Sequence, residues 1–313
     1  MKFDTYQDVT DAIIAQLEAG TRPWQMDWQG GSLQMPHRVT GEEYRGINVL
    51  LLWSSAAQQG LTGRTWMTFN QAKQLGGSVR KGCKGTRIVF FKPLTVRDTA
   101  TGEEKDIPML RTYVVFNSDQ IDNLPAKFAS APMIPAAGME RNREAETALR
   151  SSGATIVEQG ARAFYTPATD IVTMPDFERF TSASGYLATL AHELCHWTGH
   201  RTRLDRFGNN DRTSYAFEEL VAEMGAAFVG SRLGIVGEHI ENHSAYLASW
   251  LKALRDDKRA IFKAASLAQA AADMVLANAG TSNGPGIDDS AAIEQAPTTP
   301  PPAPTARQAA FTF

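Results

Sequence analysis

The sequence contains little cysteine and no long apolar run. Its two cysteines, Cys83 and Cys195, are too few for a disulfide framework and suit a reducing compartment. No stretch is apolar for long enough to span a bilayer, and the first residues lack the apolar core of a secretion signal. We therefore expect a cytoplasmic protein that does not enter a membrane.

An overall excess of positive charge is also missing. Among 313 residues, 31 Lys and Arg stand against 34 Asp and Glu, which gives a formal net charge of −3. The total charge therefore does not indicate nucleic-acid binding. Hydrophobic residues make up 43% of the chain, enough to build the cores of two ordinary domains.

The clearest chemical signal is the sequence HELCH, which runs from His192 to His196. It lies in a segment, residues 181–200, that has helical apolar spacing and no proline. Residues four apart share a helix face, so both imidazoles can reach one zinc ion. Glu193 lies beside that face, where its carboxylate can accept a proton from water and pass it to a leaving amine. This is the H-E-x-x-H signature of zinc metalloproteases; the alternative is a helix with two partly buried structural histidines.

A second helix, predicted over residues 215–228, can supply a third ligand. Glu219 is our candidate for the metal, and Glu223, one turn later, is our candidate to accept the free N–H of a ligating histidine. The exchanged assignment, with Glu223 on the metal, stays open, as does a solvated acidic stripe. Tyr215, one turn before Glu219, is a candidate donor to a developing oxyanion. We do not expect His200 to be a ligand, because it continues the first helix.

Positive charge is concentrated in one window. Residues 44–97 contain nine Lys or Arg and no Asp or Glu. Such clusters bind phosphates by releasing counterions, and aromatic rings among them can stack on unpaired bases. The mixture favours single strands over duplexes, because a duplex hides its base faces. The alternative is a solvated basic face over an ordinary core, with Trp66 and Phe69 buried.

Several segments resemble one family. Residues 44–48, 66–69 and 76–86 resemble the N-terminal domain of ArdC-type antirestriction proteins, which is also similar to the N-terminal part of plasmid TraC-type primases. Residues 189–200 and 215–223 look like the ArdC metallopeptidase domain, of gluzincin-like type. The resemblance implies a plasmid-borne protein that binds single-stranded DNA and protects incoming conjugative DNA from host restriction. It also implies a zinc-dependent peptidase domain, for which a protein of the host cell is the candidate substrate.

These observations define a set of candidate DNA contacts. They are Tyr44, Arg45, Asn48, Trp66, Phe69, Arg80, Lys81, Lys84 and Arg87. The main rival function is a non-catalytic protein that coats single-stranded DNA and whose metal site is structural or regulatory.

We expect an α+β fold with two domains. Residues 1–125 should form the single-stranded DNA-binding domain, 126–142 a linker, 143–279 the zincin-like metallopeptidase domain and 280–313 a disordered tail. We expect a short helix over residues 65–75 and a strand over residues 88–91 that pairs with residues 111–116. Residues 163–165 and 170–174 should form a hairpin, and its second strand is our candidate for an edge strand that could pair with a substrate backbone; an ordinary sheet strand would have the same sequence pattern. Residues 246–277 should form a long amphipathic helix with at most one break. A fragment ending near Pro125 should retain DNA binding.

Overall fold

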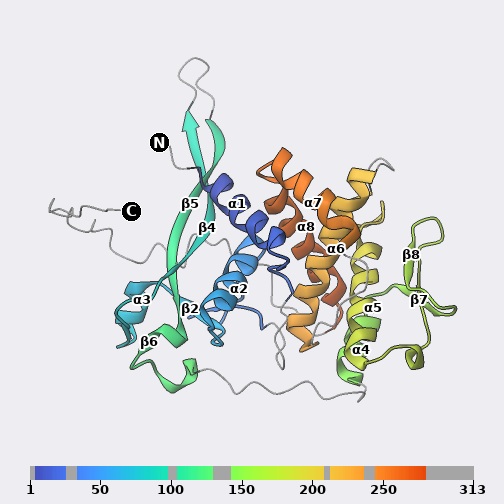
Figure 1. Cartoon of the computed structure of the whole chain (residues 1–313), viewed down its shortest axis with the longest axis horizontal. Coiled ribbons are helices and arrows are strands. Elements are labelled where there is room, and N and C mark those ends of the chain that lie inside the picture. Colours follow the sequence, from blue (N-terminus) through green and yellow to red (C-terminus); the bar gives the residue numbers. More distant parts are fainter. Residues whose placement is uncertain are drawn as a thin grey trace.

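The computed structural model describes residues 4–25, 34–97, 104–129, 142–207, 212–235 and 244–279. The predicted tail and most of the predicted linker lie outside these residues. The fold is α+β, as expected, and Figure 1 shows a long β-hairpin on one side, helices in the middle and a small sheet on the other side. Within the described ranges, no helix is long and apolar enough to cross a membrane.

The first half of the chain, up to residue 129, combines helices with a sheet of strand order β1-β2-β5-β4. Strand β1 runs parallel to β2, and the other neighbours are antiparallel. The elements are α1 (Thr5–Glu18), β1 (His37–Arg38), α2 (Ile47–Gln59), β2 (Thr65–Met67), α3 (Phe69–Gln74), β4 (Thr86–Arg97) and β5 (Glu104–Asn117), with a separate pair, β3 (Ser78–Val79) and β6 (Ile121–Asp122), and short 3-10 turns at Ser118–Gln120 and Ala126–Phe128.

The predicted pairing of residues 88–91 with 111–116 is confirmed by the β4–β5 hairpin, in which Phe90 lies opposite Arg111. Successive side chains of a strand point to opposite faces. Accordingly Phe90 is 3% exposed and Phe91 is 43% exposed, so one of the two rings joins the core and the other faces outward. The tip of the hairpin lies outside the described residues.

The predicted helix over residues 65–75 is wrong at its start. Residues Thr65–Met67 form strand β2, and helix α3 begins only at Phe69. Thr68 ends the strand and caps the helix, because its hydroxyl accepts a hydrogen bond from the Gln71 N–H (3.2 Å) while the Gln71 side chain accepts one from the Thr68 N–H (2.8 Å). Trp66 and Met67 are therefore free to pair with β5, while Thr65 and Trp66 pair with β1.

The second half, from residue 142, packs helices beside a three-stranded sheet of order β7-β9-β8. Helices α5 and α6 confirm the two predicted helices that carry the candidate metal ligands, and the long helix expected near the end is broken once, between α7 and α8. The elements are α4 (Arg143–Arg150), β7 (Thr155–Glu158), β8 (Phe164–Thr166), β9 (Ile171–Met174), a 3-10 turn at Phe177–Arg179, α5 (Ala183–Thr198), α6 (Arg212–Leu233), α7 (Ser244–Asp256) and α8 (Ala260–Leu276).

The predicted hairpin over residues 163–174 is present, but its edge was assigned wrongly. Strand β9 pairs with β7 on one side and with β8 on the other, so β9 is the central strand. The neighbouring strand β8 lies at an edge of the sheet and packs against α5. Burial of Val172, Thr173 and Met174 fits this central position.

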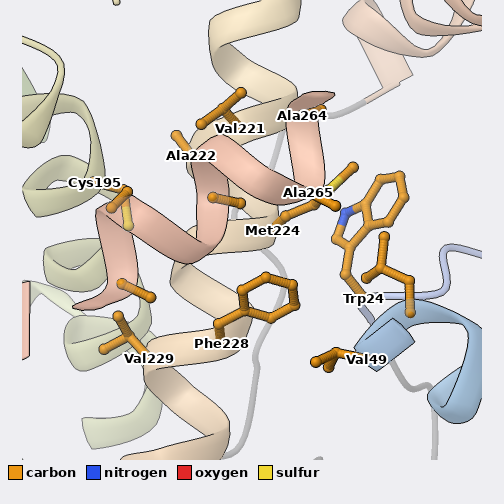
Figure 2. Packing of buried hydrophobic residues seen from close by; sticks show 14 of the residues in the cluster. Trp24, Val49, Cys195, Val221, Ala222, Met224, Phe228, Val229, Ala264 and Ala265 are labelled. Atoms are coloured by element: carbon orange, nitrogen blue, oxygen red, sulfur yellow. The ribbon is translucent and has the colours of Figure 1, made fainter. Parts of the chain in front are cut away.

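Among the described residues, one large hydrophobic core runs through both halves of the chain, beside a small separate cluster of Met67, Ala72 and Ile121. The ring of Trp24 lies 6.0 Å from that of Trp250, and Trp53 lies 5.6 Å from Phe228, measured between centroids. Figure 2 shows side chains of both halves filling the space beside α6 and α8. The boundary between the two halves, which we call the seam, is therefore built like a domain interior.

Ion pairs reinforce the seam. Arg232 of α6 pairs with Glu43 (2.8 Å), and Arg45 pairs with Asp273 of α8. A fragment ending near Pro125 would lose these partners and expose the core surface. Contrary to the expectation from the sequence, we therefore predict that such a fragment does not fold and bind DNA on its own.

Candidate metal centre

Three donor side chains from α5 and α6 converge on one point. The Nε2 atoms of His192 and His196 lie 3.1 Å apart. Glu219 Oε2 lies 3.6 Å from His192 Nε2, and Glu219 Oε1 lies 3.5 Å from His196 Nε2. All three side chains can offer a ligand atom within 4.8 Å of the others. Two imidazoles and a carboxylate are a donor set that suits zinc and similar divalent ions, so the residues fit a metal.

Local sequence explains how α5 presents its histidines. The Ser182 hydroxyl accepts a hydrogen bond from the Gly185 N–H (2.9 Å), which fixes the first turn. Leu190 and Leu194 are fully buried and anchor one face of the helix in the core. Because the helix cannot rotate without exposing these leucines, the histidines are held towards α6.

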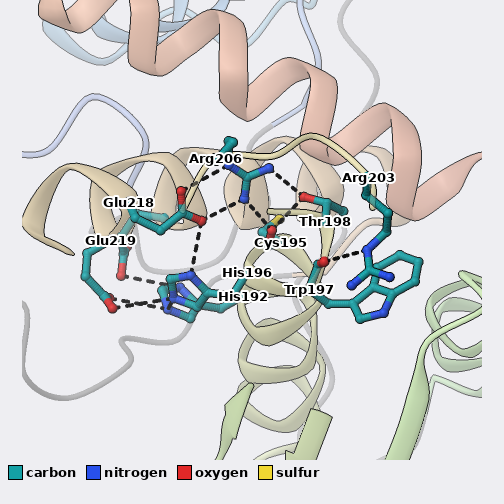
Figure 3. Close-up of polar contacts among 10 residues, drawn as sticks. His192, Cys195, His196, Trp197, Thr198, Arg203, Arg206, Glu218 and Glu219 are labelled. Carbon is teal, nitrogen blue, oxygen red and sulfur yellow. Dashed lines mark hydrogen bonds and ion pairs between the residues drawn. The ribbon is translucent and has the colours of Figure 1, made fainter. Parts of the chain in front are cut away.

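Glu218, which the sequence analysis did not single out, contacts His196 from behind. Its Oε1 lies 3.3 Å from His196 Nδ1. Arg206 donates to both Glu218 oxygens, through Nε (3.0 Å) and a terminal nitrogen (2.7 Å), and also to the Cys195 carbonyl and the Thr198 hydroxyl. Figure 3 shows this network beside the two imidazoles. Such outer contacts set the orientation and tautomer of a ligating histidine.

Glu223 takes the corresponding position behind His192. Its Oε1 lies 3.8 Å from His192 Nδ1, on the opposite side of the ring from the nitrogen that faces Glu219. The two carboxylates of α6 that sequence spacing left interchangeable thus occupy different positions in space.

The charges in this cluster stabilise one another. Burial lowers the pKa of His196, but hydrogen bonds with Glu218 and Glu219 outweigh burial and raise that pKa to about 10. Burial raises the pKa of Glu219, but hydrogen bonds with His192 and His196 outweigh it and hold the pKa well below its usual range. Glu219 is therefore ionised at neutral pH, as a metal ligand must be.

The two remaining candidates lie at the same cluster. Glu193 is buried, and its charge contributes to the raised pKa of both His192 and His196. Tyr215 is 55% exposed, and partial burial together with the neighbouring Glu219 carboxylate raises the pKa of its hydroxyl. The structure thus brings all the predicted catalytic and metal candidates together.

Comparison with known proteins agrees with this architecture. Residues 143–267 match a family of zincin-like metallopeptidases, and residues 3–116 match the N-terminal domain of the anti-restriction factor ArdC. The metal-free crystal structure of the antirestriction protein ArdC from the R388 plasmid is similar over 89% of this chain and 98% of that chain, with a TM-score of 0.80 and 49% identity. The chain belongs to the ArdC family of antirestriction proteins.

Further matches of this ArdC family member include two proteins that the chain covers almost entirely and two much longer ones. The Mn(II)-bound crystal structure of the R388 protein gives a TM-score of 0.76 and 48% identity over 88% of this chain and 98% of that chain. An uncharacterised Sinorhizobium fredii protein is 39% identical over 88% of this chain and 92% of its own length. Two Escherichia coli DNA primases named TraC are 39% and 40% identical over 87% of this chain, which spans 20% and 27% of their lengths.

Three of the candidate DNA contacts are buried, although a DNA contact should be exposed. Tyr44 and Trp66 are 5% and 2% exposed, so neither ring can stack on a base. Trp66 is buried because its ring belongs to the hydrophobic core. Asn48 is also buried; its amide donates to the Val89 carbonyl (2.8 Å) and accepts from the Val89 N–H (2.9 Å), so it ties α2 to β4.

The other DNA candidates of this ArdC family member reach the surface. Phe69 is 56% exposed at the start of α3. The basic turn, which comprises Arg80, Lys81, Lys84 and Arg87, is exposed, although Arg80 pairs with Asp122 (3.2 Å). Arg45 is half-buried in its ion pair with Asp273.

Proposed function

We propose that this ArdC family member binds single-stranded DNA, carries a zinc-dependent peptidase centre and protects incoming conjugative DNA from restriction in the cytoplasm of the host. His192, His196 and Glu219 would hold the metal, and the convergence of their donor atoms is the observation that carries the proposal. The R388 relative has a Mn(II)-bound structure, which supports the proposal of a divalent ion, and the nitrogen-rich donor set favours zinc.

The chain's own residues have distinct tasks in peptide hydrolysis. A bound divalent ion would supply a Lewis acid for the scissile carbonyl and for water. Glu193 would take up a proton on its carboxylate and return it to the leaving amine. The Tyr215 hydroxyl would donate to the oxygen on which negative charge develops. Glu218 and Glu223 would keep the two imidazole rings oriented.

Strand β8 is the proposed docking edge for a substrate backbone. It lies at the edge of its sheet and packs on α5, the helix that carries both histidines. An extended peptide can add to such an edge through main-chain hydrogen bonds. Phe164, which is exposed on β8, would contact a substrate side chain.

Burial of the centre favours a second candidate function. His192, Glu193 and Glu219 are all buried among the described residues, whereas a catalytic metal needs an open position. In this second reading the metal stabilises the α5–α6 pair, and coating of DNA alone gives protection.

Replacement of Glu193 separates the two functions. Glu193→Ala should keep about one metal per chain and keep DNA binding, because the carboxylate is not assigned to either, but should lose peptidase activity. Glu178→Ala, at an exposed acidic position, is the matched control. Activity would be followed by comparing new protein N-termini in cells that carry each variant. If cells with Glu193→Ala show the same set of new protein N-termini as cells with the wild-type protein, and keep full antirestriction protection, the DNA-coating function is favoured.

A further inference from the structure

A groove with a volume of about 930 Å³ runs along the seam, outside the metal centre. One wall comes from the first half and includes Tyr6 of α1 and Val89 and Phe91 of β4; the other wall is α8. This volume is near the upper end of the roughly 300–1,000 Å³ that ligand clefts occupy. The groove therefore has room for an extended polymer segment rather than a single ion.

One face of α8 lines the groove, and the beginning of that face is cationic. Arg259, Lys263, Ser266 and Asp273 line it at helical spacing. Arg259 and Lys263 are exposed, and the contacts described for their charged groups are with aromatic rings: Arg259 with Tyr6, and Lys263 with Phe217 at 5.7 Å from the ring centroid. The acidic Asp273, by contrast, is already engaged by Arg45 and by Arg232 (3.1 Å). Two cations thus lie at one end of the groove, beside Asp257, whose carboxylate accepts a hydrogen bond from the Arg259 N–H (2.8 Å).

An aromatic cluster stands beside these cations. The ring of Phe91 lies 6.4 Å from that of Tyr6 and 6.5 Å from that of Phe262, and these two lie 4.8 Å apart. The Arg259 guanidinium lies 5.1 Å from the Tyr6 ring. Phe91 is therefore an exposed ring held in position by two others, which makes it a rigid platform for stacking.

We infer that this groove binds single-stranded nucleic acid, with a base stacked on Phe91 and phosphates at Arg259 and Lys263. The inference rests on the single-strand binding of the proposed function and places its main contact at the seam rather than at the basic turn. Stacking selects unpaired bases, and paired cations select the backbone, so the combination matches a single strand and not a duplex. Because α8 supplies the cations and β4 the ring, both halves of the chain are needed for binding.

Fluorescence anisotropy with a labelled oligothymidylate and the full-length protein tests this inference. Phe91→Ala should weaken binding roughly 5- to 150-fold with little change in the salt dependence. The Arg259→Gln/Lys263→Gln double variant should flatten the slope of log affinity against log salt by about 1.4, since each phosphate contact on a single strand contributes about 0.7. The Lys81→Gln/Lys84→Gln variant removes equal charge from the basic turn and compares that competing site with the groove; it should weaken binding less than the groove variants do.

The possible outcomes separate this inference from the proposed function. Wild-type affinity in the groove variants, with weaker binding in the Lys81→Gln/Lys84→Gln variant, would overturn the groove site and leave single-strand binding intact. No binding by the wild-type chain would overturn both. Photocrosslinking with a bromodeoxyuridine oligonucleotide gives a readout on unmutated protein. Crosslinks should map to β4 and α8, and crosslinks confined to residues 80–84 would contradict the groove site.

Discussion

At the residue scale, three glutamates of α6 take different positions around two imidazoles. Glu219 faces both Nε2 atoms, whereas Glu218 and Glu223 each approach an Nδ1 atom from behind. Consecutive helix residues differ in direction by about 100°. Adjacent glutamates can therefore reach the same histidine pair from different sides, which gives each a separate effect on metal affinity.

Glutamine substitutions should distinguish these three positions. Glu219→Gln should lose most of the bound metal, because it removes a charged ligand. Glu218→Gln and Glu223→Gln should weaken metal binding roughly 10–100-fold, because they only loosen the orientation of an imidazole ring. Metal content per chain and competition with a chelator measure both effects. An empty site in Glu223→Gln and a full site in Glu219→Gln would show that the third ligand is wrongly assigned.

The sequence predicted part of this site. The motif identified His192, Glu193 and His196, because helical spacing alone places them together. The sequence favoured Glu219 as the third ligand but left the exchange with Glu223 open, because the two carboxylates share a helix face. It missed Glu218, whose position depends on Arg206 in the loop after α5. The neighbouring pair Glu218-Glu219 was the available signal, since two adjacent carboxylates in an apolar helix both need partners.

At the scale of elements, close packing between α5 and α6 depends on a glycine. A Cβ atom on Gly225 would lie 2.7 Å from the buried Cys195 sulfur, whereas a Cβ atom on Gly230 would meet nothing closer than 3.5 Å. Both glycines lie within α6. They therefore form a matched pair for measuring the cost of filling this contact.

Gly225→Ala should destabilise the protein, and Gly230→Ala should not. Alanine gains about 0.5–1 kcal/mol over glycine in a helix. Overpacking at Gly225 costs about 1–3 kcal/mol, so the net loss should be on the order of 1 kcal/mol. Denaturant unfolding in the presence of a chelator measures both variants. Adding Cys195→Ala to Gly225→Ala should recover part of the loss; equal stability of the two single variants would contradict the tight contact.

Element type was more predictable than element position. Short runs of β-branched and aromatic residues identified β4 and β5, and helical spacing identified α5 and α6. The three-residue strand β2 was misassigned, because Thr65–Met67 is too short to show a period of two. The central position of β9 depends on pairing with β7, and strand order cannot be read from the strand's own residues.

At the scale of the molecule, the two segments that match different family models share one hydrophobic core. We predict a single unfolding transition that coincides when followed by tryptophan fluorescence and by far-UV circular dichroism, because Trp24, Trp53 and Trp250 pack across the seam. The isolated fragment 1–125 should lack a near-UV signal and bind a hydrophobic dye. Two separate transitions, or a folded fragment, would contradict the continuous core.

The seam itself could not be predicted from the sequence. A segment rich in alanine, proline and methionine indicated a boundary between domains, and the chain composition gave no sign of whether the domains touch. The apolar face of α8 reads the same whether it covers its own domain or a neighbour. Contacts in the folded chain, such as those of Tyr6 with Phe262 and of Arg45 with Asp273, show that it also faces the first half.

Anomalous X-ray scattering from crystals of the purified protein, recorded at the zinc and manganese edges, tests the central claim most directly. It identifies the metal and its ligands in one measurement. The account predicts one zinc peak per chain, about 2.0–2.2 Å from His192 Nε2, His196 Nε2 and a Glu219 oxygen. A peak bound instead by Glu218 or Glu223, or no peak in metal-replete crystals, would contradict it.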